Sequence, residues 1–151
     1  MMKIPALVFI LFVINLNLFS QIKVADVGDG WKNKVDSAIQ IIKKYDIEKY
    51  NFLLESCTNI GYWNEKFSTT EGDSTIIIST IDLRNPNIYN IAAIIVHESM
   101  HLYIKQMFFK IQEKEEEVLS YKYELNFLLK IPDVDQWLIS NSLKMIEYYE
   151  K

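Results

Sequence analysis

The sequence predicts an α+β domain in which a small antiparallel or mixed sheet packs on one long helix, with two to three further helices beside it. Three observations predict this class. Residues 75–83 are β-branched almost throughout, which is typical of a strand. Residues 86–112 stay rich in apolar side chains and, after Pro86, contain no proline or glycine, which favours a long helix. Two more helical stretches follow before the C-terminus.

The length, charge and cysteine count exclude several classes of protein. The chain has 151 residues and a formal net charge of −4, a length that fits one ordinary domain. It has one cysteine, which excludes an intramolecular disulfide framework and zinc modules built on four cysteines or two cysteines and two histidines. The acidic balance, with Arg84 as the single arginine, argues against nucleic acid as a partner.

The first 20 residues have the pattern of an export signal. Lys3 is the only lysine or arginine before Lys23, and residues 6–14 form an unbroken apolar run. We therefore expect residues 1–20 to be a cleaved signal peptide and residues 21–151 to be a single domain, secreted or periplasmic and free of the membrane after cleavage. An uncleaved membrane anchor is the alternative, although the run is shorter than the roughly 20 residues that a span needs.

The first half of the mature chain predicts one helix and two strands. Apolar residues at helical spacing predict a helix over 30–46, with Asp29 as its N-cap. Residues 47–58 fit either a short helix or a strand. Residues 60–67 and 75–83 are expected to be strands, joined through a connection at 70–74.

The second half predicts three helices. Asn85 is expected to cap a long helix that begins at Pro86 and runs to about residue 112. The charged stretch 113–117 either bends the chain or begins the next helix, which ends before Pro132. After a capping pattern at 133–136, the last helix runs to about residue 149.

Both histidines of the chain lie in the sequence His97-Glu98-Ser99-Met100-His101, on the long predicted helix. Four residues correspond to about 400° of helix rotation, so the two imidazoles share one face and can hold one ion. Glu98 lies about 100° around the helix and borders the ion, where a carboxylate can accept a proton from water. This is the HExxH pattern of zinc metalloproteases.

A catalytic zinc ion needs three protein ligands and one open position. No third histidine exists, and Cys57 lies far upstream in an ambiguous segment. A carboxylate from the following helix is the simplest third ligand. The candidates are Glu113, Glu115, Glu116, Glu117 and Glu124. Such a charge cluster is usually a solvated helix face, so we expect four of the five to face solvent.

One face of the following helix carries Glu117, Tyr121 and Glu124 at spacings of four and three. Because both histidines are committed to the metal, a tyrosine is the expected helper for the oxyanion, and Tyr121 lies one turn from Glu117. Glu124 is a candidate partner for a zinc-bound imidazole, which normally needs one. A solvated position for Glu124 fits the sequence equally well.

These motifs resemble the gluzincin zinc metallopeptidases in their small single-domain form. The HExxH helix is followed by a helix in which Glu117, Ser120, Tyr121 and Tyr123 match the family pattern, and the resemblance covers roughly residues 60–130. It implies a minimal zincin-like domain with zinc ligands His97, His101 and Glu117, and with Glu98 as general base. It also implies that the strand at 75–83 forms the edge of the cleft, where an extended peptide can pair.

The sequence thus favours an exported Zn²⁺-dependent peptidase, a hydrolase that acts on peptide or protein substrates. The alternative is a non-catalytic zinc-binding domain that interacts with a partner and is exported or anchored at the membrane. A membrane-anchored structural protein in which the HExxH pattern is accidental is a third reading.

Overall fold

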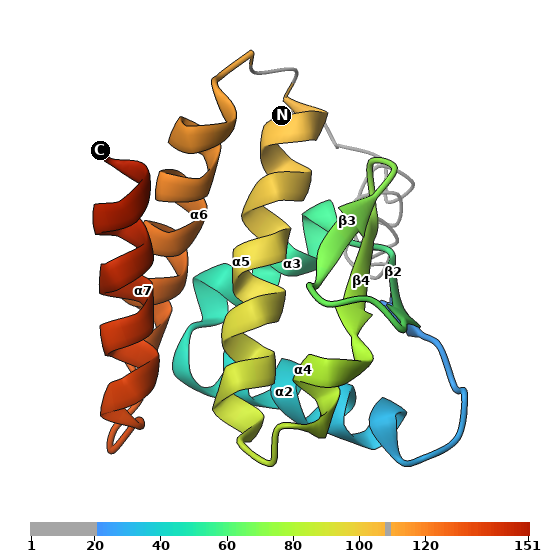
Figure 1. Cartoon of the computed structure of the whole chain (residues 1–151). Coiled ribbons are helices and arrows are strands. Elements are labelled where there is room, and N and C mark those ends of the chain that lie inside the picture. Colours follow the sequence, from blue (N-terminus) through green and yellow to red (C-terminus); the bar gives the residue numbers. More distant parts are fainter. Residues whose placement is uncertain (1–20, 108–109) are drawn as a thin grey trace, which may run out of the picture.

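The computed structural model describes residues 21–107 and 110–151, and these form an α+β fold as predicted (Figure 1). The expected signal peptide, residues 1–20, lies outside the described residues. The elements, in chain order, are β1 (Lys23–Val24), α2 (Trp31–Tyr45), α3 (Ile47–Ser56), β2 (Asn59–Trp63), β3 (Thr69–Glu71), β4 (Thr75–Ser79), α4 (Thr80–Arg84), α5 (Ile88–Gln106), α6 (Glu113–Leu128) and α7 (Gln136–Tyr149).

The sheet is small and mixed. Its strands lie in the order β1-β2-β4-β3, with β1 parallel to β2, β2 parallel to β4, and β3 antiparallel to β4. The expectation that the 75–83 strand forms the edge is therefore wrong. β4 is an interior strand because it pairs on both sides, and the short strand β3 is the edge.

The strand predicted over residues 75–83 is also shorter than expected, because hydrogen bonds of the Ser79 side chain end it. Ser79 ends β4, and its Oγ accepts a hydrogen bond from the amide of Ile81, which caps α4. The same hydroxyl donates to the carbonyl of Glu65. These bonds turn the chain although the residues that follow still favour a strand by composition.

Both ends of the long helix also differ from the prediction, and side-chain hydrogen bonds to the backbone account for the new helix starts. The long helix α5 is capped by Asn87, whose side chain accepts a bond from the amide of Tyr89, and not by Asn85. It ends at Gln106 and not near 112. Gln112 and Glu115 form a capping box that begins α6, so the charged stretch starts a new helix. The ambiguous segment 47–58 is helical, with Asp46 as the cap of α3.

Helix α5 is the centre of the fold. It packs against α6, α2, α3, β3 and β4, and α7 packs on α6 (Figure 1). Ile91, Ile95 and Leu102 are fully buried, and such a helix, apolar over most of its surface, is typical of a central position. The middle of α5, which carries both histidines, is thereby fixed from several sides.

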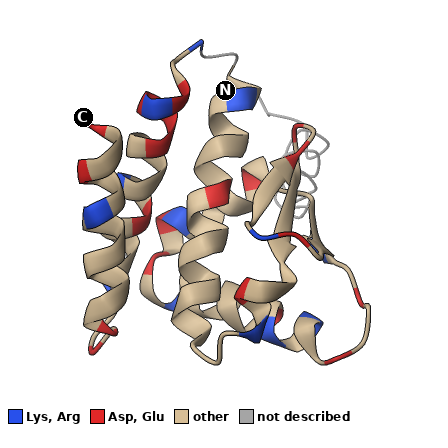
Figure 2. Cartoon of the chain, viewed as in Figure 1, with Lys and Arg blue, Asp and Glu red and all other residues tan. Residues whose placement is uncertain are grey.

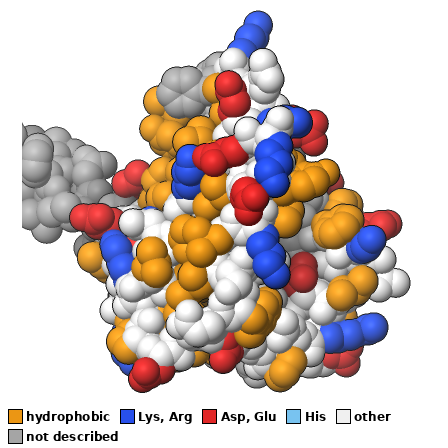
Figure 3. Space-filling view, turned by 60° about the vertical axis from the view of Figure 1, so that its left-hand side comes forward, with side chains coloured by type: hydrophobic (Ala, Val, Ile, Leu, Met, Phe, Trp, Pro, Cys, Tyr) orange, Lys and Arg blue, Asp and Glu red, His pale blue; other side chains and the backbone are white. Residues whose placement is uncertain are grey.

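The side formed by α6 and α7 is covered by hydrophobic side chains interspersed with charged ones (Figure 3). Leu119, Trp137, Leu143 and Tyr148 of these helices are exposed. Among the described residues, no helix combines the length and the hydropathy that crossing a membrane requires.

Candidate metal centre

The structure brings His97, His101 and Glu117 together, as the sequence predicts. Nε2 of His97 and Nε2 of His101 are 3.1 Å apart on the side of α5 that faces α6. Helix α6 runs back along α5 and presents Glu117, whose Oε2 lies 3.6 Å from Nε2 of His97 and whose Oε1 lies 3.6 Å from Nε2 of His101. The ligand atoms of the three residues all lie within 4.8 Å of one another, so the cluster could hold a metal ion.

The spacing of the ligand atoms is compatible with a small tetrahedral ion. Zinc binds histidine nitrogen at about 2.0–2.1 Å, which places neighbouring ligands of a tetrahedron about 3.3 Å apart. The two Nε2 atoms are 3.1 Å apart, and each lies 3.6 Å from a different oxygen of Glu117, so these distances are close to that value. Two imidazoles and one carboxylate are also a donor set of catalytic zinc, with the fourth position left open.

A second carboxylate lies behind each imidazole. Nδ1 of His101 is 2.6 Å from Oε1 of Glu116, and Nδ1 of His97 is 3.1 Å from Oε2 of Glu124. The contact between His97 and Glu124 is short but is not aligned as a hydrogen bond. Among the described residues, Nδ1 of His97 has no hydrogen-bond partner. An ionised carboxylate only accepts, so each contact favours the tautomer with its proton on Nδ1 and its Nε2 lone pair facing the cluster.

The electrostatic environment favours a positive charge at this point. Burial lowers the pKa of His97, but the carboxylates of Glu117 and Glu124 outweigh burial and raise that pKa to about 10. Burial, together with the neighbouring charge of His97, lowers the pKa of His101. Without a metal, a proton on His97 supplies this positive charge; a metal cation bound by the cluster would replace that proton.

Glu98 lies beside the cluster, where a general base is needed. It is 7% exposed, lines the same cleft, and forms no hydrogen bond or ion pair among the described residues. Burial raises the pKa of Glu98 to about 7, although the charge of His97 opposes the shift. A carboxylate with a pKa near neutrality accepts and releases a proton readily at physiological pH.

Tyr121 lies on the wall of the cleft, against the first histidine. Its ring centroid is 4.3 Å from that of His97, and its other face stacks on Tyr149 of α7. Burial and the charge of Glu124 raise the pKa of Tyr121 above its usual range, so the hydroxyl stays protonated. Within the described part of the chain this hydroxyl makes no hydrogen bond.

The other candidate ligands have different positions. Glu113 is exposed, and Glu115 belongs to the capping box of α6. Cys57 is fully buried at the end of α3, donates to the carbonyl of Asn59 and is not part of the cluster. The expectation that four of the five glutamates are solvated is wrong for Glu116 and Glu124. The position of Glu124 near the cluster could be expected from the sequence, because it lies two helical turns after Glu117. For Glu116, the only indication in the sequence was that it is next to Glu117.

The cluster opens into a cleft of about 620 Å³ that runs over α5. One wall is the segment that leads into β3 and the start of β3 itself, including Phe67 and Thr70. The other wall is formed by α6 and α7, including Tyr121 and Met145. The cluster therefore lies in a cleft between the β3 side and the helices α6 and α7.

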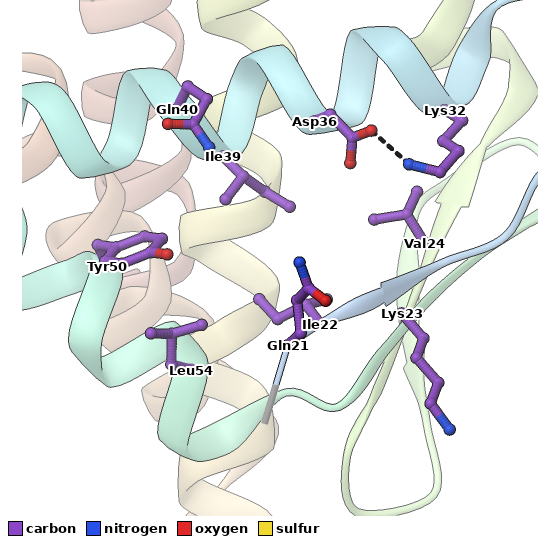
Figure 4. A pocket seen from close by; sticks show the side chains of 10 residues that line it. All are labelled: Gln21, Ile22, Lys23, Val24, Lys32, Asp36, Ile39, Gln40, Tyr50 and Leu54. Carbon is purple, nitrogen blue, oxygen red and sulfur yellow. Dashed lines mark hydrogen bonds and ion pairs between the residues drawn. The ribbon is translucent and has the colours of Figure 1, made fainter. Parts of the chain in front are cut away.

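A larger hollow of about 1190 Å³ lies elsewhere, between β1, α2 and α3 (Figure 4). Apolar side chains such as Ile22 and Leu54 line it together with the ion pair of Lys32 and Asp36. Its lining contains no histidine or cysteine, so the metal-binding chemistry of the described residues belongs to the cleft over α5.

Comparisons of the chain with protein-family models, with curated proteins and with solved structures find no match. The function is therefore inferred from the residues of this chain alone.

Proposed function

We propose that the chain is an exported zinc-dependent peptidase of the small gluzincin type. One observation carries this proposal: a His-His-Glu cluster, with ligand atoms within 4.8 Å of one another, lies in an open cleft beside a buried carboxylate that has no hydrogen-bond or ion-pair partner among the described residues. The HExxH pattern supplies both histidines and that carboxylate from one helix.

Each residue of the cluster has a distinct role in this proposal. His97, His101 and Glu117 hold the zinc ion. Bound zinc supplies a Lewis acid, which polarises a carbonyl and makes water acidic enough to lose a proton near neutral pH. Glu98 accepts the proton of the attacking water on its carboxylate and passes it to the nitrogen of the leaving amine.

Tyr121 is proposed to donate a hydrogen bond to the oxygen that becomes negative during the reaction. Its protonated hydroxyl, free of other partners in the described structure, supports this role. A donor aimed at a developing oxyanion is often a large contributor to catalysis.

The substrate is proposed to lie along β3 and not along β4. The outer edge of β3 pairs with no other strand of the described sheet, and Thr69 and Thr70 of this strand line the cleft. An extended peptide can add to such an edge through main-chain hydrogen bonds.

The test is Glu98→Gln, with Glu55→Gln as the matched control because Glu55 is exposed on α3 and outside the cleft. Metal content per chain is measured by mass spectrometry, and hydrolysis by quenched fluorescent peptides. We expect one zinc ion per chain in both variants and a loss of hydrolysis of roughly 10²- to 10⁴-fold in Glu98→Gln alone.

Two results would contradict the proposal. If the protein purified in the presence of zinc contains no bound metal, the proposed zinc site does not exist. Bound zinc without hydrolysis of any peptide in a broad library favours the alternative, a non-catalytic zinc-binding domain that interacts with a partner.

A further inference from the structure

We propose that this cleft selects basic peptides, in which lysine or arginine side chains flank the bond that is cleaved. The inference rests on the proposed peptidase function and adds the class of substrate. It follows from the balance of fixed charge along the cleft and not from the metal cluster itself.

The lining of the cleft is strongly acidic. Among its described residues it contains six carboxylates and a single lysine, and no arginine. The carboxylates are Asp82, Glu98, Glu113, Glu116, Glu117 and Glu124. A divalent ion at the cluster offsets two of these charges, so an excess of negative charge remains. The first turns of α6, next to α5, show part of this acidic surface (Figure 2).

Two of these carboxylates are free of the histidine cluster and lie toward opposite ends of the cleft. Asp82 is on α4, near the beginning of α5, and Glu113 is the first residue of α6, near the end of α5 (Figure 1). Neither forms an ion pair with a described residue. The dipole of α6 offsets only about half a charge near Glu113.

Asp82 is held in place by neutral groups. The hydroxyl of Ser68 donates to its Oδ2 at 2.7 Å, and the same hydroxyl accepts from the amide of Ser79. These bonds fix the carboxylate at the wall of the cleft without neutralising its charge. A fixed charge can attract a substrate cation without first losing its own conformational freedom.

The single lysine, Lys105, offsets one of these negative charges and leaves an excess in place. Lys105 lies one turn beyond His101 on α5, and its ammonium group donates to the hydroxyl of Thr70 on β3. It is therefore held at one wall. A groove lined by one sign of charge concentrates ligands of the opposite sign and repels ligands of the same sign.

The first experiment compares three peptides on the zinc-loaded protein. All have the same length and the same central bond, flanked by lysines, by glutamines or by glutamates. We expect kcat/KM to fall in that order. The advantage of the lysine peptide over the glutamine peptide is expected to shrink as salt rises, because salt screens charges at the rim of a cleft.

Variants then locate the effect. Glu113→Gln and Asp82→Asn each lower the ratio of kcat/KM for the lysine and glutamine peptides by up to about fivefold, the scale of one exposed charge pair. Lys105→Gln raises the same ratio. Glu55→Gln changes the net charge by the same amount outside the cleft and leaves the ratio unchanged. Glu113 is exposed, so Glu113→Gln remains informative if Asp82→Asn folds poorly.

The outcomes separate this inference from the proposed function. Equal kcat/KM for the three peptides, or preference for the glutamate peptide, overturns the inference and leaves the peptidase intact. If no peptide is cleaved, the peptidase proposal fails, and the same peptides carrying a fluorophore are tested for binding. Tighter binding of the lysine peptide, lost in Glu113→Gln or at high salt, then supports the inference. Equal binding or none overturns it.

Discussion

Each histidine of the cluster is fixed from behind by a carboxylate of α6. Glu116 lies behind His101, and Glu124 behind His97. Glu124 is itself held by Ser142 of α7, whose hydroxyl donates to Oε1 at 2.7 Å. Side chains from α5, α6 and α7 thus together orient the two imidazole rings.

Removing either of these carboxylates is expected to weaken zinc binding without abolishing it. Glu116→Gln and Glu124→Gln should each lower zinc affinity by about 10- to 100-fold, because the imidazole loses the negatively charged acceptor that raises its basicity. Competition with a chromophoric chelator measures the affinity. Glu115→Gln, in the capping box, serves as the control. Unchanged affinity in both variants would show that these contacts do not support the ligands.

The sequence could predict His97, Glu98 and His101 because their relation is local to one helix, where a spacing of four fixes a shared face. Among the glutamates of α6 it favoured Glu117 through the family resemblance, while helix spacing by itself left the choice open. That choice depends on how far α6 is rotated about its axis when it packs on α5, which is decided by the core and not by the sequence around the glutamates.

A buried charged group far from the cluster gives a prediction on stability. Asp46 caps α3, is 3% exposed and pairs with Lys130 at 2.9 Å and Lys49 at 3.6 Å. Burial raises the pKa of Asp46, but the bonds from Lys130 and Lys49 outweigh burial and hold the pKa below its usual value.

Because the folded pKa is lower than the unfolded one, the ionised Asp46 stabilises the fold above about pH 4, and this stability is lost as pH falls through the folded pKa. Asp46→Asn should therefore cost about 1–3 kcal/mol at pH 7, since it removes the negative charge that pairs with the buried Lys49 and with Lys130. Urea unfolding at pH 7 and pH 3 measures this difference. A difference that persists unchanged at pH 3 would contradict the explanation.

At the scale of elements, composition predicted the longer helices and the strands β2 and β4, but not the short elements β1, β3 and α4, and local hydrogen bonds decided where the predicted elements end. The helices over residues 31–45 and 136–149 match the predicted helices closely because their apolar periodicity runs to both ends. The strand after Thr75 and the helix before Ile88 were misjudged because one serine and one asparagine bond to the backbone there.

Helix α6 depends on one aromatic anchor. Phe127 is fully buried near the end of this helix and belongs to the main core. Phe127→Ala should lower the free energy of unfolding by about 3–5 kcal/mol, through lost burial and the cavity it leaves. Leu129→Ala, at a position 63% exposed, should change it by less than about 0.5 kcal/mol. Similar costs for the two variants, measured in urea, would mean that α6 is not anchored at Phe127.

At the scale of the whole molecule, a metal ion held by the cluster would connect two layers of the fold. His97 and His101 belong to the helix that carries the sheet, and Glu117 belongs to the layer of α6 and α7. An ion held between them stabilises the folded state only, because the three ligands converge only when α5 and α6 are packed.

Zinc at a thousandfold excess over its dissociation constant should therefore stabilise the protein by about 4 kcal/mol. Differential scanning calorimetry with zinc and with a chelator measures the change in Tm. The difference should largely disappear in His101→Ala, which lacks one ligand. A Tm that is the same with zinc and with chelator would contradict a metal site in the native protein.

The placement of the cluster on two consecutive helices also bears on how the protein folds. The ligands and their supporting carboxylates span residues 97–124, whereas the sheet must join strands from residue 23 to residue 79. Contacts between neighbouring segments close shorter loops and form earlier than distant ones. The α5–α6 hairpin can thus form, and begin to bind metal, before the sheet is complete.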